Sequence, residues 1–106
     1  DAPSRPAQFR ELPAFPPSPR DLAVLVDRTT PAGDLLDAVR EKGGALLRDA
    51  RVFDVYTGRQ VPPDKKSVAI SLVFQSPERT LTDADTQQAF DRIVRHLERK
   101  FQAVLR

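Results

Sequence analysis

Hydrophobic and polar residues alternate through residues 20–27, where Leu22, Val24 and Val26 fall on one face. Residues 67–75 repeat this pattern, with large apolar side chains at every second position and small ones between them. A period of two residues with one strongly apolar side is typical of a strand that covers a core on one face only. The sequence therefore predicts a strand in each of these segments.

A further strand is predicted from about residue 46 to residue 57. Strict alternation there places Phe53 and Val55 on the core face, and Val52, Asp54 and Tyr56 on the opposite face. The next nine residues form a loop with two consecutive prolines, which cannot donate to a β ladder. We therefore expect two antiparallel strands joined by a long loop.

The first of two expected helices follows the strand at 20–27. Thr30 is its expected N-cap and Pro31 its first helical residue. Leu35, Leu36 and Val39 provide its apolar stripe, and a pair of glycines at positions 43 and 44 ends it.

The second helix is expected to start near Thr82, where Asp85 takes the place of the usual glutamate of a capping box. Apolar residues then recur at helical spacing through residues 90–101. Residues 101–106 are long enough for a short last strand.

This β-α-β-β-α-β order predicts an α+β fold of the ferredoxin-like type, a four-stranded antiparallel sheet with both helices on one face. The expected spatial order of the strands is 4-1-3-2. Residues 1–19 hold six of the ten prolines, so we expect them to form a proline-rich arm or linker, with the domain at 20–106.

The composition is typical of one soluble globular domain, with 40% hydrophobic and 30% charged residues in 106. Seventeen Lys and Arg against fifteen Asp and Glu give a net charge of +2, which permits contact with nucleic acid without indicating a strong general binder. The chain begins at Asp1 without a signal-peptide pattern and contains no cysteine. From this we expect a piece of a longer cytoplasmic protein.

The sheet face opposite the helices carries the candidate site. Tyr56, the single tyrosine, shares this face with Asp54, with Ser67 on the next strand and with Ala23 on the first strand. Small residues beside one aromatic ring leave room for a flat ligand such as a nucleobase, which can stack on the ring. Asp54 can accept hydrogen bonds from a base, and Ser67 can donate or accept one.

Arg59, Lys65 and Lys66 lie in the loop beside this face and can reach a phosphate backbone. A purely structural role for these residues stays open, because tyrosine also favours strands for packing reasons and lysines are common at solvated loop tips. The strip of alanine and serine can equally be covered by another domain of a longer protein.

No catalytic residue is expected in this chain. It has no cysteine and one histidine, His96, which falls on the second helix, so neither a Cys–His pair nor a histidine-rich metal site can be built. A glycine-rich phosphate loop is also lacking. We therefore expect no metal site and no cofactor bound to this chain.

Five segments in order resemble the ferredoxin-fold anticodon-binding domain found at the C-terminus of bacterial phenylalanine–tRNA ligase β subunits. The first combines FP at 15–16 with RDLA at 20–23, and the other four are FDVYTG at 53–58, KSVA at 66–69, ERTLTD at 78–83 and LR at 105–106. The resemblance covers residues 9–106.

The resemblance implies a cytoplasmic α2β2 enzyme that joins phenylalanine to its tRNA with ATP and Mg²⁺, with catalysis in the α subunit. This domain would bind the anticodon loop of phenylalanine tRNA. The resemblance places Tyr56 against the first anticodon base and Asp54, Ser67 and Ala23 around that base. Neither DNA nor a membrane is an expected partner.

The alternative is a ferredoxin-like regulatory or protein-interaction domain that pairs through its open face or edge. Two other families share the topology but fit less well. An acylphosphatase-type enzyme needs a glycine-rich phosphate loop after the first strand, which is lacking here. An RNA-recognition motif carries aromatic residues where this chain has Ala69 and Ser71.

Overall fold

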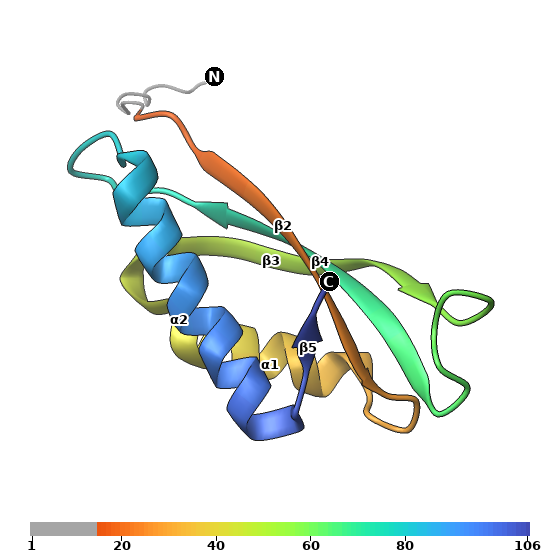
Figure 1. Cartoon of the computed structure of the whole chain (residues 1–106). Helices are drawn as coiled ribbons and strands as arrows, with labels where there is room; N and C mark the ends of the chain where they lie inside the picture. The colour runs from red at the N-terminus through yellow and green to blue at the C-terminus, as the bar shows by residue number, and fades with distance from the viewer. Residues whose placement is uncertain (1–14) are drawn as a thin grey trace, which may run out of the picture.

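The computed structural model describes residues 15–106. In chain order its elements are β2 (Ser18–Asp27), α1 (Ala32–Gly43), the short 3-10 helix η1 (Gly44–Leu46), β3 (Leu47–Tyr56), β4 (Lys65–Phe74), α2 (Asp83–Phe101) and β5 (Val104–Leu105). The strands form one antiparallel sheet in the order β3-β4-β2-β5, and both helices lie on one side of it (Figure 1). The predicted ferredoxin-like α+β fold and its strand order are confirmed.

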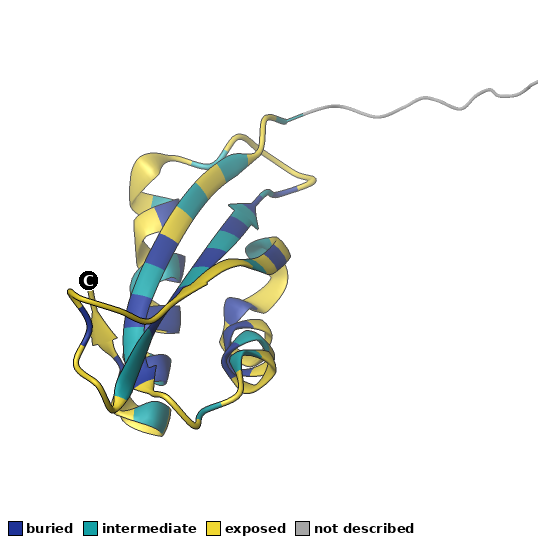
Figure 2. Ribbon diagram, turned by 90° about the vertical axis from the view of Figure 1, so that its right-hand side faces the viewer, coloured by how far each residue is buried: buried dark blue, intermediate teal, exposed yellow. Residues whose placement is uncertain are grey.

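The core lies between the sheet and the two helices. Alternation along β2 and β4 buries alternate side chains there, and Figure 2 shows the two strands striped accordingly. The fully buried apolar side chains from all four elements are Val24, Val26, Leu35, Val39, Val68, Ile70, Leu72, Phe74, Ile93 and Leu97. Within residues 15–106, no helix covers the opposite face of the sheet.

Strand β3 departs from the expected alternation. Its pairing with β4 shifts register twice, between Leu47 and Asp49 and again between Val52 and Asp54. Val52 pairs with Ile70 and packs against the core, so its predicted place on the open face was wrong.

The two apolar residues that follow Val52 on β3 are more exposed than predicted. Phe53 and Val55, predicted in the core, are 56% and 49% exposed. A bulge adds a residue to one strand of a pair and bends it. Val52 therefore turns to the helix side, whereas Asp54 and Tyr56, beyond the bulge, stay on the open face as predicted.

Three element boundaries also differ from the prediction. Helix α1 has Pro31, not Thr30, at its N-cap, and it has no side-chain cap because proline carries no polar side-chain atom. Thr30 instead belongs to the preceding turn, where its N–H donates to the Asp27 carbonyl at 3.0 Å. Strand β4 begins at Lys65, within the expected loop. Strand β2 begins at Ser18, within the expected proline-rich arm, of which residues 1–14 lie outside the described residues.

The predicted capping box of α2 is confirmed. The Asp85 N–H donates to Thr82 Oγ1 and the Thr82 N–H donates to Asp85 Oδ2, both at 3.0 Å. The Arg79 guanidinium also binds this carboxylate, and this bond, with those from Thr82, lowers the pKa of Asp85 to about 2. Neither helix in the described part of the chain has the length and hydropathy needed to cross a membrane.

Candidate nucleic-acid interface

The open face, meaning the sheet face opposite the helices, is organised in rows across the strands. Residues directly opposite in an antiparallel pair project from the same face. One row runs from Tyr56 on β3 through Ser67 on β4 to Leu25 on β2. The neighbouring row runs from Asp54 through Ala69 to Ala23.

The predicted site residues Tyr56, Asp54, Ser67 and Ala23 therefore lie in two adjoining rows. The expected strand order predicts that Ser67 lies between Ala23 and the end of β3 that carries Asp54 and Tyr56. The register instead places Ser67 opposite Leu25, and Ala23 opposite Ala69. Strands are about 4.8 Å apart, so each row brings its side chains close enough to contact one small ligand.

Small side chains form the floor of this site. Ser67 is only 6% exposed although it lies on the open face, because the larger Tyr56 and Leu25 flank it on either side. Leu25 thus provides a wall opposite the tyrosine, a role that the sequence reasoning did not assign to it. The alternation placed Leu25 on this face, but only the register places it across Ser67 from Tyr56.

Tyr56 is 41% exposed at the end of β3, and its position depends on Gly58. Gly58 has a φ of +145°, and a Cβ at that position would lie 2.8 Å from Tyr56 Oη and 3.1 Å from Cζ. The end of the tyrosine ring therefore lies against the glycine. A larger residue at position 58 would push the ring away.

The loop that follows Tyr56 is held by the backbone. The Val61 N–H donates to the Gly58 carbonyl at 3.1 Å, and the Arg28 N–H donates to the Asp64 carbonyl at 2.9 Å. Val61 itself is buried, with 6% exposure. These contacts fix the loop beside the tyrosine.

The three basic candidates differ in their placement. Lys65 lies opposite Asp27 and forms an ion pair with it at 2.7 Å, and this hydrogen bond raises the pKa of Lys65. Lys66 lies opposite the buried Val26, so it leaves the strand from the helix side of the sheet. Arg59 is exposed in the loop between β3 and β4.

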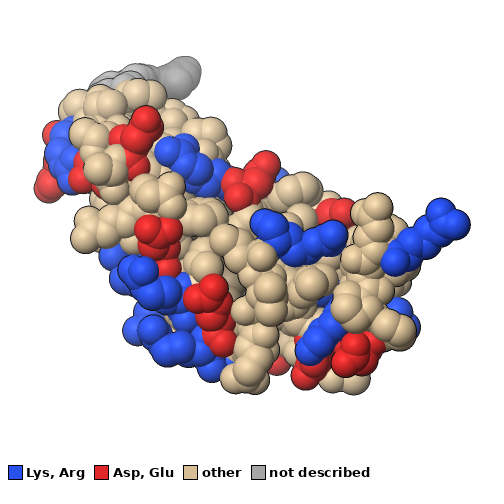
Figure 3. Space-filling model, viewed as in Figure 1, with Lys and Arg blue, Asp and Glu red and all other residues tan. Residues whose placement is uncertain are grey.

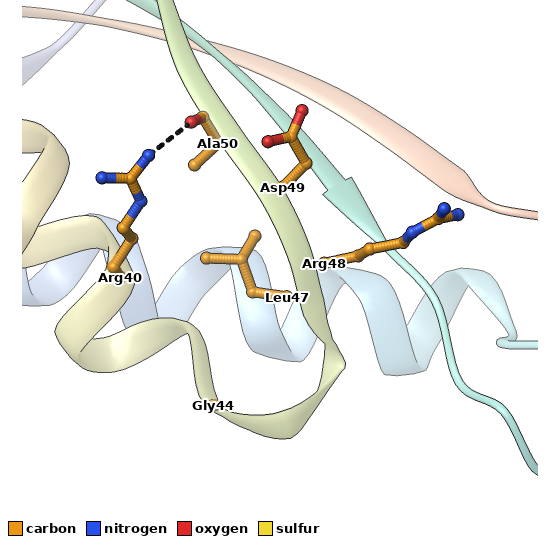
Figure 4. Close-up of a pocket in the computed structure, with 6 residues that line it drawn as sticks. All are labelled: Arg40, Gly44, Leu47, Arg48, Asp49 and Ala50. Atoms are coloured by element: carbon orange, nitrogen blue, oxygen red, sulfur yellow. Dashed lines mark hydrogen bonds between the residues drawn. The ribbon is translucent and has the colours of Figure 1, made fainter.

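A cleft of about 330 Å³ lies elsewhere, at the start of β3 and the end of α1. Within it the Arg40 guanidinium donates to the Ala50 carbonyl at 3.3 Å, on the outer edge of β3. Figure 4 shows Arg48 extending away from Arg40, so the two arginines do not converge on a common ligand. Since Leu47, at this end of β3, lies opposite Phe74, whereas Tyr56 lies opposite Ser67, the cleft is remote from the tyrosine.

Charge on the helix side is mixed. Figure 3, viewed from the same direction as Figure 1, shows Lys and Arg interspersed with Asp and Glu over the helices. Across residues 15–106, no group of three or more His, Cys, Asp or Glu side chains is placed to hold a metal ion.

Comparison with known proteins gives the family. Residues 13–106 match the model of the ferredoxin-fold anticodon binding domain. The chain belongs to this family.

Curated relatives agree with this assignment. The chain is 48% identical over 99 residues to a phenylalanine–tRNA ligase beta subunit of Clostridium tetani, covering 93% of this chain and 12% of that protein. It is 52% identical over 95 residues to the beta subunit of Vibrio parahaemolyticus, covering 90% and 12%. For the Bacillus subtilis beta subunit the identity is 40% over 105 residues, covering 99% and 13%.

The chain thus spans only a small part of the length of these relatives, and the family model covers every residue that the structure describes. In the described part of this anticodon-binding domain, the open face is the surface of the sheet that no helix covers. That surface carries the cluster of Tyr56, Asp54, Ser67 and Ala23.

Proposed function

We propose that this chain is the anticodon-binding domain of a phenylalanine–tRNA ligase β subunit and that it binds the anticodon loop of phenylalanine tRNA on its open face. The observation that carries the proposal is the pairing register, which brings Tyr56, Ser67, Asp54 and Ala23 into two adjoining rows. The family match and the named relatives support the choice of RNA as ligand.

Each residue has a distinct role in this proposal. The ring of Tyr56 stacks on the first anticodon base, an interaction that contributes about 1–3 kcal/mol per base. Stacking tolerates any base, so selectivity has to come from hydrogen bonds. Asp54 accepts them from the N–H groups of the base, Ser67 donates or accepts one, and Ala23 leaves space for the base.

Phosphate contacts complete the binding. Arg59 and Lys65 leave from the loop and from the open face next to the site, where they can approach the RNA backbone. Lys65 would have to exchange its ion pair with Asp27 for a phosphate. Lys66 contributes only around the edge of the sheet, because its strand position directs it to the helix side.

Catalysis is placed outside this chain. In the proposed parent, an α2β2 enzyme of the cytoplasm, the α subunit uses ATP and Mg²⁺ to join phenylalanine to the tRNA. The sequence here has no glycine-rich phosphate loop, and residues 15–106 hold no cluster of metal-ligating side chains. In this proposal ATP and Mg²⁺ act in the α subunit, and the contribution of this domain is to position and select the tRNA.

The tyrosine makes a direct test possible. Tyr56 is the single tyrosine and there is no tryptophan, so the intrinsic fluorescence of the chain reports on this one ring. We expect a phenylalanine-tRNA anticodon stem-loop to quench this emission on titration. A stem-loop altered at the first anticodon base should bind more weakly.

Variants separate stacking from other contacts when binding is followed with a labelled stem-loop. Tyr56→Ala should weaken binding roughly 5- to 150-fold, the loss of one stacked base. Tyr56→Phe keeps the ring and should bind nearly as well. Val55→Ala is the matched control. Val55 is the neighbour of Tyr56 in the chain, but it lies opposite the buried Val68 and so projects from the other side of the sheet. Equal binding by all variants would refute the stacking role.

A second candidate function is protein interaction, which is favoured by the exposure of Phe53 and Val55 on an edge strand of the sheet. Edge strands with apolar side chains are suited to contact with another polypeptide. Under this alternative the stem-loop would not bind at millimolar concentration, and Phe53→Ser would weaken association with the rest of the parent subunit.

A further inference from the structure

The short strand β5 places more side chains on the open face than the sequence reasoning assigned to it. Val104 lies opposite Leu25 and Leu105 opposite Val24. The Arg106 N–H then donates to the Ala23 carbonyl at 2.8 Å, which continues the ladder by one residue. Alternation therefore directs Val104 and Arg106 to the open face, and Leu105 to the helix side.

This arrangement extends both rows of the site. The row of Tyr56, Ser67 and Leu25 continues to Val104, which is 58% exposed. The row of Asp54, Ala69 and Ala23 continues to Arg106. A carboxylate thus lies at one end of the second row and a guanidinium at the other, about 14 Å apart across three strand spacings, with two alanines between them.

The charge of Arg106 is available, unlike that of two other cations on this face. Arg51 is paired with Asp49 at 3.0 Å, and Lys65 with Asp27 at 2.7 Å. Arg106 is exposed and forms no ion pair with any residue in the range 15–106.

We propose that Arg106 binds a backbone phosphate of the RNA, next to the nucleotide whose base stacks on Tyr56. This inference rests on the proposed function and adds a contact that closes the site on the side of β5. The planar guanidinium matches a phosphate with two parallel hydrogen bonds.

The geometry favours a phosphate over a base as the partner of Arg106. The base is held at the β3 side of the face, where Tyr56 and Asp54 lie. Its sugar and phosphate then extend over Ala69 and Ala23, toward a long arginine side chain on β5. Val104 and Leu25 provide an apolar surface for the sugar along the same path.

The test measures binding of a labelled phenylalanine-tRNA anticodon stem-loop to the 106-residue chain over a series of salt concentrations. Arg106→Gln should weaken binding about two- to fivefold near 0.1 M salt, as expected for one exposed ion pair. The slope of log K against log salt should also fall in magnitude by about 0.7, because one fewer counterion-releasing phosphate contact is made on a single strand.

Two further variants make the result specific. Arg106→Lys keeps the charge and should restore most of the salt slope, though not the paired hydrogen bonds. Arg95→Gln removes the same charge from an exposed position on α2 and should leave affinity and slope nearly unchanged. The ladder bond of Arg106 uses its backbone N–H, so both substitutions at this position keep β5 paired, which a thermal melt will verify.

The outcomes distinguish this inference from the proposed function. If Arg106→Gln behaves like Arg95→Gln while Tyr56→Ala loses binding, the phosphate contact is refuted and the stacking site stands. If Arg106→Gln lowers the slope but Tyr56→Ala has no effect, the RNA is bound by its backbone and the stacking site fails. No binding by the unsubstituted chain at millimolar RNA would overturn both.

Discussion

Replacement of Gly58 by alanine is expected to disable the tyrosine without touching the core. The added Cβ would lie 2.8 Å from Tyr56 Oη and 3.1 Å from Cζ, both shorter than an ordinary contact of 3.4–4 Å. The end of the ring must therefore retreat by at least about half an ångström, and small rotations about its side-chain bonds carry it away from the stacking position.

Gly58→Ala has two expected costs, one in the stability of the fold and one in RNA binding. A side chain at a φ of +145° costs roughly 1–3 kcal/mol of stability, since the region is restricted to glycine. Loss of the stacked ring costs up to about 1–3 kcal/mol of RNA binding. We expect a urea melt to detect the first effect and a stem-loop titration to detect the second.

Gly44→Ala is the matched control for backbone strain. Gly44 also has a positive φ, +68°, but the nearest atom to its added Cβ is the flexible end of Arg92 at 3.4 Å. It should lower stability without weakening RNA binding. A partial rescue is expected in Gly58→Ala/Tyr56→Phe, because the closest atom, Oη, is then absent.

The reasoning is refuted if Gly58→Ala binds the stem-loop as tightly as the unsubstituted chain while Tyr56→Ala does not. It is equally refuted if Gly44→Ala loses RNA binding to the same extent, since strain alone would then account for the loss.

Two further predictions concern stability. Arg79 and Thr82 lower the pKa of Asp85 to about 2, so the stability that this carboxylate adds is present above its ordinary pKa of 3.8 and is lost as the pH falls toward 2. In a pH series of thermal melts, Asp85→Asn should flatten the decline in melting temperature between these two values. A decline as steep as that of the unsubstituted chain would contradict the assignment. Phe53→Ser should change the free energy of unfolding by only about 0.5 kcal/mol or less, because Phe53 is 56% exposed. A loss of several kcal/mol in a urea melt would show that the ring is buried.

Much of the fold could be read from local patterns. Strands β2 and β4 have a regular period of two, and α2 has an apolar stripe and a capping box, so their identity depends on residues close together in the chain. Period and topology together then predicted the helix-covered face, and with it the placement of Tyr56, Asp54, Ser67 and Ala23 on the other face. The register confirms that placement, while their contact with RNA stays a prediction.

The edge strands could not be read in this way. A β-bulge is a property of two paired strands, so nothing in the sequence of β3 alone indicated that Val52 would turn inward and that Phe53 and Val55 would be exposed. Likewise a strand of two residues has too few positions to show a period, so the place of Arg106 beside Ala23 was not predicted.

The sequence by itself determined the elements, their order and the face on which the aromatic residue lies, because these follow from side-chain periodicity and turn chemistry within short segments. Only the tertiary structure decided which residues meet across strands. Ser67 lies between Tyr56 and Leu25, Gly58 supports the tyrosine ring, and Arg106 joins the row of Asp54. These contacts depend on the strand register and on the close approach of backbone segments. Both are set by hydrogen bonds between segments that are distant in the sequence, so they form only when the chain folds.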